Sequence, residues 1–226
     1  MKNGFFVLAV LLLFNLSVSA QKLYTVSGGE IIFQSASVEK KIDGVNTSVN
    51  TNLRFTLFLH IGEYLHYDFG DHVGMFTGLG IRNVGLITDE DSIKAKFRTY
   101  NLGMPLAIKF GSFKKNLFLF GGAEYEWMFH FKQKNFVENT KSKYTSWFSK
   151  HTPAFIPSVF VGLQMPAGFQ FKFRYYLDNY LKENYTYLSA PEGFNKTQVW
   201  YISVSYQIRN NKIREYKPIS TDMAIR

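Results

Sequence analysis

Apolar and polar residues alternate with a period of two along most of the chain. The clearest case is segment 100–110, in which Tyr100 and every second residue up to Phe110 are apolar, while the positions between them are small or polar. Successive side chains of a β-strand point to opposite faces, whereas a helix repeats every 3.6 residues. We therefore predict that 100–110 is a strand with one wholly apolar face.

Seven other segments alternate in a similar way, which gives eight predicted strands in all. The connections between them are alternately long and short along the chain. An even number of strands with tight turns at one end and longer loops at the other is typical of a closed, antiparallel, up-and-down β-barrel. The chain is therefore predicted to be all-β. The other strands are expected at 29–36, 55–61, 73–82, 117–131, 155–165, 169–177 and 200–208, and the longer loops at 37–52, 88–94, 133–152 and 179–197.

The alternation does not by itself say whether the apolar faces point inward or outward. A soluble lipocalin-like barrel turns them inward around a ligand, and an outer-membrane barrel turns them outward to lipid. The apolar faces run from 11 residues in 100–110 to 15 in 117–131. At about 3.3 Å per residue and about 40° of tilt they span roughly 28–38 Å, enough to cover an apolar band of about 25 Å. This length favours a transmembrane barrel.

Aromatic residues support the same choice. They make up 18% of the chain, with 23 Phe, 14 Tyr and 3 Trp, and those on the apolar faces gather toward the ends of the strands. Barrels in lipid carry aromatic girdles at the membrane interfaces, whereas the interior of a lipocalin has no reason to sort its rings in this way. The girdle on the loop side is predicted at Tyr100, Tyr125, Trp127, Phe129, Phe155, Tyr175 and Trp200.

The opposite faces of the strands carry ionisable residues of both signs. An eight-stranded barrel is only wide enough to be filled by its own side chains, and a buried charge needs a partner. We therefore expect a lumen that is plugged by paired charges and closed to free solute flow. The predicted lumen network consists of Arg82, Lys109, Glu124, Glu126, His130, Lys172, Arg174 and Asp178.

The N-terminus reads as a targeting signal. Lys2 precedes an unbroken apolar stretch at 5–14, and small residues then lead to a cleavage site between Ala20 and Gln21. The expected organisation is a signal peptide at 1–20, a short segment at 21–27, the barrel at 28–209 and a polar periplasmic tail at 210–226, with both termini in the periplasm. The chain has no cysteine, which excludes a disulfide scaffold and a cysteine-based zinc site.

Basic residues outnumber acidic ones, and the formal net charge is +9. Many of these cations are predicted to lie on the loop side, which on an outer membrane faces phosphorylated lipopolysaccharide. Cations there can pair with phosphates, although a merely solvating charge set is the competing interpretation. Nucleic-acid binding is not expected, because export denies access. The predicted phosphate contacts are Lys94, Lys96, Arg98, Lys132, Lys134 and Lys150.

The sequence gives little indication of a catalytic site or a metal site. His130, and His151 with Ser149, are the candidate groups for an enzyme that modifies lipid A, but the sequence offers no third partner for either histidine. The remaining histidines lack any known metal-ligand spacing. No cofactor and no metal are expected.

Two stretches carry a family resemblance: Phe-Thr-Gly-Leu-Gly-Ile-Arg-Asn-Val-Gly at 76–85 and Pro-Ser-Val-Phe-Val-Gly at 157–162. Together with the signal peptide and the strand count, they make residues 28–209 resemble the small outer-membrane β-barrels of the OmpA/OmpX kind, particularly the PorT-like barrels of Bacteroidetes. One departure is the polar tail that follows 206–209, where such barrels usually end on an aromatic strand.

The resemblance implies a non-enzymatic protein of a Gram-negative envelope. Its implied roles are envelope structure, surface interaction or membership of a secretion complex, and its implied partners are outer-membrane lipid, lipopolysaccharide and the barrel-assembly machinery. The alternatives are a lipid-A-modifying barrel enzyme and a soluble periplasmic lipocalin-like binding protein.

Overall fold

The computed structural model describes residues 22–42, 44–90, 93–137, 140–183 and 193–212. The predicted signal peptide, its cleavage site at Ala20 and Gln21, and residues 213–226 of the predicted tail lie outside the described residues. Strands dominate the described chain, and it holds no helix that is long and apolar enough to cross a membrane.

The elements follow one another as a series of strands with one short 3-10 turn. They are β1 (Lys22–Ile42), β2 (Val45–Val49), β3 (Arg54–Thr56), β4 (Ile61–Asp68), β5 (Val73–Glu90), β6 (Ile93–Ser112), β7 (Leu117–Val137), β8 (Thr140–Trp147), β9 (Phe155–Gln164), η1 (Pro166–Gly168), β10 (Phe169–Tyr176) and β11 (Phe194–Lys212).

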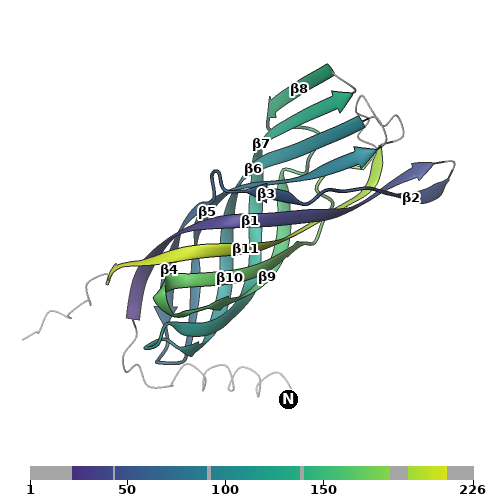
Figure 1. Ribbon diagram of the computed structural model, residues 1–226. Helices are drawn as coiled ribbons and strands as arrows, with labels where there is room; N and C mark the ends of the chain where they lie inside the picture. The colour runs from purple at the N-terminus through teal and green to yellow at the C-terminus, as the bar shows by residue number, and fades with distance from the viewer. Residues whose placement is uncertain (1–21, 43, 91–92, 138–139, 184–192, 213–226) are drawn as a thin grey trace, which may run out of the picture.

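Eight strands form the barrel wall (Figure 1). Going round the wall, β1, β4, β5, β6, β7, β9, β10 and β11 each pair with the next, and β11 pairs with β1 to close the ring. All of these pairings are antiparallel. The prediction of an all-β, closed, up-and-down barrel of eight strands is therefore confirmed.

The register sets a stagger of ten residues. A line of directly paired residues that leaves β1 at Lys22 returns to β1 at Ile32, ten residues further along. The line passes through Asp68, Gly74, Lys109, Phe120, Gly162, Lys172 and Ser203. Such a stagger tilts the strands against the barrel axis, so residues from distant strands reach the same level of the lumen.

The strands are longer than the alternation predicted. Segments 88–94 and 133–152 were predicted as loops, but β5, β6, β7 and β8 continue through most of them as a paired sheet that projects beyond the barrel wall. Likewise, β1 and β2 form a projecting hairpin within 37–52. The inner face of the extensions is buried, but it mixes apolar residues such as Leu86 and Ala95 with the polar Gln133 and Asn135. The wall itself starts at Lys22 and ends at Lys212, beyond the predicted limits of 28 and 209.

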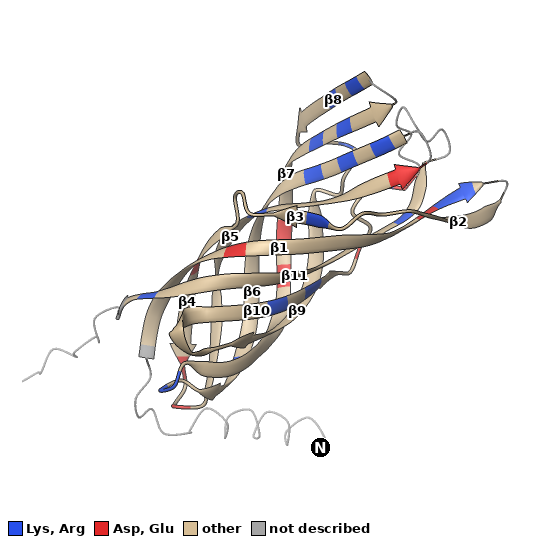
Figure 2. Ribbon diagram, viewed as in Figure 1, with Lys and Arg blue, Asp and Glu red and all other residues tan. Residues whose placement is uncertain are grey.

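Polarity is inverted relative to a soluble protein. Apolar side chains on the outward face are widely exposed, including Ile108 at 67% and Phe110 at 65%, whereas Arg82 and Arg174 are 2% and 1% exposed inside the barrel. Figure 2 shows acidic and basic positions within the wall and a concentration of basic positions on the projecting sheet. The apolar faces therefore point outward and the ionic faces inward.

Two apolar clusters lie at the ends of the lumen. A cluster near the tight turns includes Phe76, Phe118, Phe120 and Phe160. A larger one toward the loop side consists of Ile32, Ala36, Val38, Val49, Val84, Leu86, Ala95, Phe97, Met128, Phe131, Ile156, Tyr176, Tyr180, Leu181, Phe194, Val199 and Tyr201. The lumen is thus a packed core whose middle layer is ionic.

Candidate functional site

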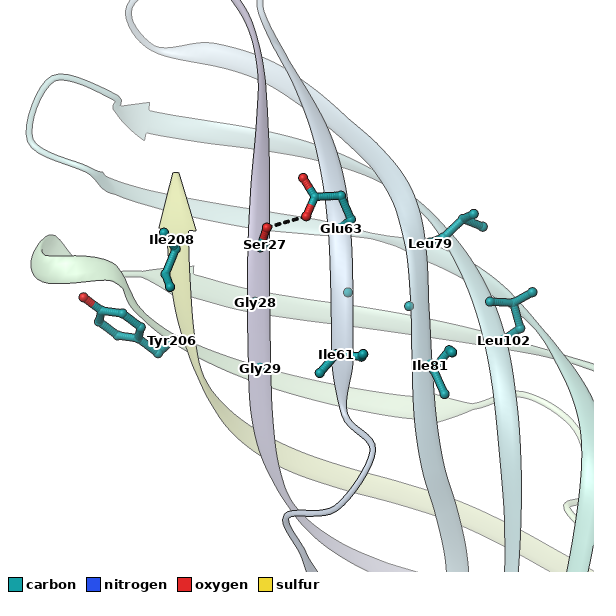
Figure 3. A pocket seen from close by; sticks show the side chains of 12 residues that line it. Ser27, Gly28, Gly29, Ile61, Glu63, Leu79, Ile81, Leu102, Tyr206 and Ile208 are labelled. Carbon is teal, nitrogen blue, oxygen red and sulfur yellow. Dashed lines mark hydrogen bonds between the residues drawn. The ribbon is translucent and has the colours of Figure 1, made fainter. Parts of the chain in front are cut away.

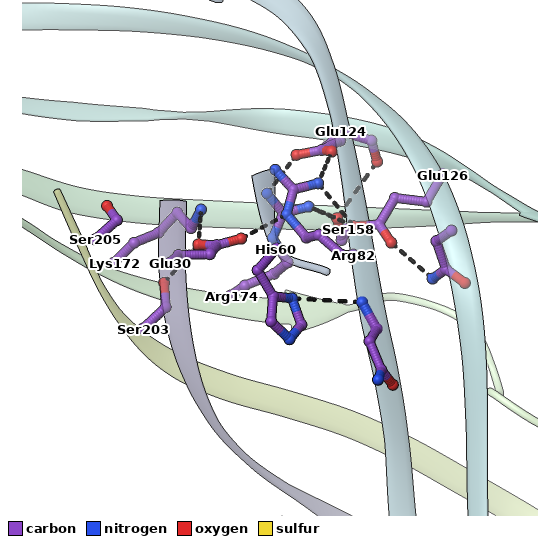
Figure 4. A network of polar contacts seen from close by, with 12 residues as sticks. Glu30, His60, Arg82, Glu124, Glu126, Ser158, Lys172, Arg174, Ser203 and Ser205 are labelled. Atoms are coloured by element: carbon purple, nitrogen blue, oxygen red, sulfur yellow. Dashed lines mark hydrogen bonds and ion pairs between the residues drawn. The ribbon is translucent and has the colours of Figure 1, made fainter. Parts of the chain in front are cut away.

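An ionic network fills the middle of the lumen (Figure 4). Four wall strands contribute to it, each at positions whose side chains point inward. All six members are buried, with exposed fractions of 8% or less. The members are Glu30 of β1, Arg82 of β5, Glu124 and Glu126 of β7, and Lys172 and Arg174 of β10. Three carboxylates thus face three cations.

Arg82 and Lys172 both reach Glu30. Arg82 Nε lies 2.7 Å from Glu30 Oε1, and Lys172 Nζ lies 2.7 Å from Glu30 Oε2. Ser203 donates a further hydrogen bond of 3.0 Å to Glu30 Oε2. Every oxygen of this carboxylate therefore has a charged partner, which is what burial of a charge requires.

Arg174 joins the two carboxylates of β7. Its guanidinium pairs with Glu124 and lies 2.8 Å from Glu126 Oε1. The Glu126 carboxylate also accepts hydrogen bonds from Tyr176, at 3.0 Å, and from Asn101, at 2.8 Å. With its acids held by cations and hydroxyl or amide donors, the network acts as a brace across the lumen and offers no free acid or base.

A second polar cluster lies nearer the tight turns. Lys109 Nζ is 2.5 Å from Asp68 Oδ1, 2.8 Å from the Tyr24 hydroxyl and 3.0 Å from His66 Nδ1. Its ammonium also lies over the ring of Phe113, 4.5 Å from the ring centroid. Lys109 is therefore inside the barrel, as predicted from its strand face, but it belongs to this cluster and makes no ion pair with the six-residue network.

Little empty space remains between these groups. Two voids between the described residues of the lumen have volumes of about 20 Å³ and 40 Å³. A single water needs roughly 10–15 Å³ of such volume, so each void holds a few waters at most. A lumen with voids of this size has no room for a drug-sized or lipid-sized ligand.

Two residues predicted for the lumen network lie elsewhere. His130 faces outward because β7 carries a β-bulge: Tyr100 pairs with His130 and Asn101 with Met128, which leaves Phe129 as the extra residue. The His130 ring contacts Trp147 at a centroid distance of 4.6 Å. Asp178 follows the end of β10 and is exposed. The prediction that His130 and Asp178 face the lumen is therefore wrong.

The predicted network also omitted important members. Glu30, Asp68 and His66 are buried and paired inside the barrel. Glu30 shares its face of β1 with the buried Ile32 and Gln34, so extending the alternation of segment 29–36 by strand parity would have found it. Asp68 lies between the predicted strands 55–61 and 73–82, and only the pairing of β4 with β1 and β5 places it at the end of a strand.

The projecting sheet carries rows of cations on its outward face. Arg98 pairs directly with Lys132 across β6 and β7, and Lys96, Lys134 and Lys143 stand opposite one another across β6, β7 and β8. Like charges placed directly opposite each other destabilise a sheet. Lys150, which was predicted to join this set, lies exposed in the turn after β8.

Few carboxylates compensate these cations. Lys94 pairs with Asp89 at 2.9 Å, but among the described residues no ion pair forms to Arg98, Lys132, Lys134 or Lys143. Partial burial and the nearby charges of Arg98, Lys141, Lys132 and Lys143 hold the pKa of the Lys134 ammonium below its ordinary value. The outward face of the extension is thus suited to binding an anion.

Aromatic side chains occupy the outward face just below these cations. The predicted residues Tyr100, Tyr125, Trp127, Phe129, Phe155, Tyr175 and Trp200 all lie on it, half-buried or exposed. Neighbours stack on several of them: Tyr125 on Phe155 at a centroid distance of 5.4 Å, and Phe129 on Trp147 at 6.0 Å. On β6, Arg98 is the next outward residue beyond Tyr100.

The groups considered for catalysis do not assemble a reactive site. Ser149 Oγ accepts a hydrogen bond of 3.1 Å from the backbone N–H of His151, and the His151 ring packs against Tyr144 and Phe131. Burial holds the pKa of His151 below its ordinary value. Among the described residues, no group of three or more histidine, cysteine or acidic side chains could hold a metal ion.

Comparison with known proteins gives matches to solved structures only. No protein-family model and no curated protein sequence matches this chain. The attachment invasion locus protein Ail of Yersinia pestis is 16% identical over 80% of this chain and 98% of its own, with a TM-score of 0.31. Neisserial surface protein A is 11% identical over 84% and 99%, with a TM-score of 0.41. The outer membrane protein OprG of Pseudomonas aeruginosa is 12% identical over 83% and 96%, with a TM-score of 0.39.

Proposed function

We propose that this protein is an integral outer-membrane barrel, closed to solutes, whose projecting sheet binds phosphate groups of lipopolysaccharide. The observation that carries the proposal is the inverted polarity of the wall. Exposed apolar side chains cover its outside and paired charges fill its inside. Water would solvate the opposite arrangement, whereas lipid requires this one.

The interior argues against a soluble carrier. A lipocalin-like protein needs an apolar cavity for its ligand, but the middle of this lumen holds the six-residue ionic network and voids of about 20 Å³ and 40 Å³. The same packing argues against a pore. A barrel of eight strands that is filled in this way serves as a membrane anchor for whatever its extensions contact.

The cations of the projecting sheet supply the contact. They begin one outward position beyond the aromatic residue Tyr100, which is the level at which rings meet lipid headgroups. Directly opposed ammonium and guanidinium groups repel one another, and a bound phosphate would relieve that repulsion. Lipopolysaccharide presents phosphates at this level of the outer leaflet.

Other roles rest on the sequence resemblance alone. These are membership of the PorT-like barrels, insertion by the barrel-assembly machinery, and partnership with a secretion complex or a surface ligand. A non-enzymatic role is part of the same proposal.

The membrane part of the proposal is tested by fractionation of expressing Gram-negative cells. We expect the protein in the detergent-extracted outer-membrane fraction, with a gel mobility that changes on heating, and no solute release from liposomes that contain it. Recovery in the soluble periplasm would favour the lipocalin-like alternative. Loss of an acyl chain from the lipid A of these cells would favour the enzyme.

The phosphate part is tested with the Lys132→Gln/Lys134→Gln double variant. Binding of lipid A to the reconstituted protein should fall about tenfold or more, as expected when hydrogen bonds to a charged group are lost. Lys114→Gln/Lys115→Gln removes equal charge on the turn side and should leave the affinity unchanged. If lipid A without phosphates binds the wild-type protein equally well, the proposed contact is wrong.

A further inference from the structure

A groove crosses the outward face of the wall where β11, β1, β4, β5 and β6 lie side by side (Figure 3). Its volume is about 770 Å³. Most of its lining is apolar, and it includes Ile61, Leu79, Ile81, Leu102, Tyr206 and Ile208. It lies outside the barrel, on the surface that faces lipid under the proposed function.

One missing outward side chain opens the groove. Of the four glycines that line it, Gly28, Gly62 and Gly80 face the lumen, where a Cβ would meet the Gln207, Tyr64 and Arg82 side chains, and only Gly29 faces outward. Gly29 is exposed on the outward face, and a Cβ built there would meet only the backbone oxygen of His60, at 3.7 Å. A larger side chain at Gly29 would therefore project into the groove without displacing the wall.

One carboxylate stands in this apolar setting. Glu63 lies between Ile61 and Leu65 on the outward face of β4 and pairs with Leu79 of β5, and all three apolar neighbours are exposed, at 60%, 37% and 55%. Within the described residues it is the only charged side chain on the outward face of the wall below the projecting sheet. An ionisable group facing hydrocarbon is costly and marks a functional position by default.

Three polar neighbours orient the carboxylate. Ser27 donates a hydrogen bond to Glu63 Oε2, Asn210 donates one of 3.1 Å to Glu63 Oε1 and another of 2.6 Å to Ser27 Oγ, and the Thr25 side chain also hydrogen-bonds to Glu63. A carboxylate has about four acceptor sites, so about one remains. No lysine, arginine or histidine of the described residues pairs with Glu63, and its charge lacks a cation.

We propose that this groove binds a phospholipid with a primary ammonium headgroup. The ammonium donates to the remaining acceptor site of Glu63, and an acyl chain lies along Ile61, Leu79 and Ile81. The inference rests on the proposed membrane location. Glu63 is five residues from Asp68, at the turn end of β4, so the site belongs to the periplasmic leaflet, away from the cations of the projecting sheet.

The charges select among lipid classes. An anionic headgroup without an ammonium is repelled by Glu63. A quaternary ammonium neutralises the charge but has no N–H to donate. A primary ammonium satisfies both the charge and the remaining acceptor site, which makes phosphatidylethanolamine the matching probe.

The test is native mass spectrometry of the barrel released from nanodiscs. The discs contain equal amounts of phosphatidylethanolamine, phosphatidylcholine and phosphatidylglycerol. The wild-type protein should retain one phosphatidylethanolamine in preference to the other two. Glu63→Gln should reduce that preference about tenfold or more, the loss expected for hydrogen bonds to a charged group.

Two leucine variants separate the groove from the rest of the belt. Gly29→Leu fills the groove and should abolish retention of the lipid. Gly121→Leu is the control, because Gly121 lies on the outward face of β7, away from the groove, and a Cβ there would meet only Phe160 O, at 3.5 Å. It should retain the lipid as the wild type does.

The outcomes distinguish this inference from the proposed function. Insertion into nanodiscs with equal retention of the three lipids, or unchanged preference in Glu63→Gln, would overturn the groove proposal and leave the membrane barrel intact. A wild-type dimer in the discs that Gly29→Leu dissociates would assign the groove to a second copy of the chain instead. Failure to enter any bilayer would overturn both.

Discussion

Arg82 on β5 and Glu124 on β7 form an ion pair across the lumen, over the intervening strand β6. The pair passes above Gly103 of β6, where a Cβ would overlap both Glu124 Oε1 and the Arg82 guanidinium. Arg82 also pairs with Glu30 of β1. A single guanidinium therefore ties together three strands that are not neighbours in the wall.

Replacing Arg82 tests whether this brace stabilises the barrel. Arg82→Met keeps the length of the side chain but leaves Glu30 and Glu124 short of a cation in a dry interior. The free energy of unfolding should fall by about 3–5 kcal/mol, as for other broken buried ion pairs. Urea titration of the protein refolded into lipid measures it.

An exposed ion pair gives the matched control. Lys114 Nζ lies 2.9 Å from Asp71 Oδ2, with side chains 75% and 43% exposed. Lys114→Ala should cost at most about 1 kcal/mol. Equal losses for Arg82→Met and Lys114→Ala would mean that the lumen is wet and the network contributes no brace.

Gly103 provides a steric test of the same pair. Gly103→Ala places a methyl group where the Glu124 carboxylate lies, so the ion pair must shift or break. Overpacking of this kind costs about 1–3 kcal/mol. Gly121→Ala adds the same methyl group on the outward face, 3.5 Å from the nearest atom, and should be nearly neutral. The difference between the two midpoints of urea unfolding is the measurement, and similar midpoints would contradict the packing described here.

Strand parity predicted much of this arrangement but not its pairing. Arg82, Glu124 and Arg174 were assigned to one interior because each alternates with outward apolar residues. Which carboxylate meets which cation depends on the stagger of ten residues, and that number follows only from the register of all eight strand pairs. Lys109 illustrates the limit: its face was predictable, and its partner Asp68 was not.

The bulge in β7 marks a second limit. Residues 127–131 read Trp-Met-Phe-His-Phe, with a bulky side chain at every position and no glycine to signal an extra residue. Continuing the alternation through this stretch put His130 inside and Phe131 outside, the reverse of what the structure has. The projecting strands escaped detection for a related reason, because their buried face includes the polar residues Gln133 and Asn135 and β8 is exposed along almost its whole length.

A charge introduced into the apolar belt tests the membrane assignment directly. Leu106 is 58% exposed on the outward face of β6. Leu106→Arg should destabilise the protein in a bilayer by about 2–4 kcal/mol if that face contacts lipid near the midplane. In a soluble protein the same substitution at an exposed position would change the free energy of unfolding by no more than about 0.5 kcal/mol.

Ser37→Arg is the control for this charge. Ser37 is exposed on β1, two residues beyond Ser35, which pairs with the girdle residue Trp200. An arginine there lies above the apolar belt and should lower the free energy of unfolding by between zero and about 1 kcal/mol. Unfolding of both variants in bilayers of defined thickness gives the comparison, and a cost at Leu106 no larger than at Ser37 would refute the lipid-facing assignment.

Neutralising Lys134 should change stability and phosphate binding in opposite directions. In the free protein, Lys134 stands opposite Lys96 and Lys143, so Lys134→Gln relieves two like-charge pairs and should stabilise the projecting sheet by about 0.2–1 kcal/mol per pair in a zwitterionic bilayer. With phosphate bound, the cation is an attractive partner, and the same variant should bind lipid A more weakly. Hydrogen exchange of the β7 and β8 amides measures the first effect and lipid A titration at low salt measures the second. Added salt should shrink both effects, because these charges are at least partly exposed to solvent. A variant that loses stability as well as affinity would show that Lys134 has a structural partner in the folded sheet, and the cationic face would then lose its role as an anion site.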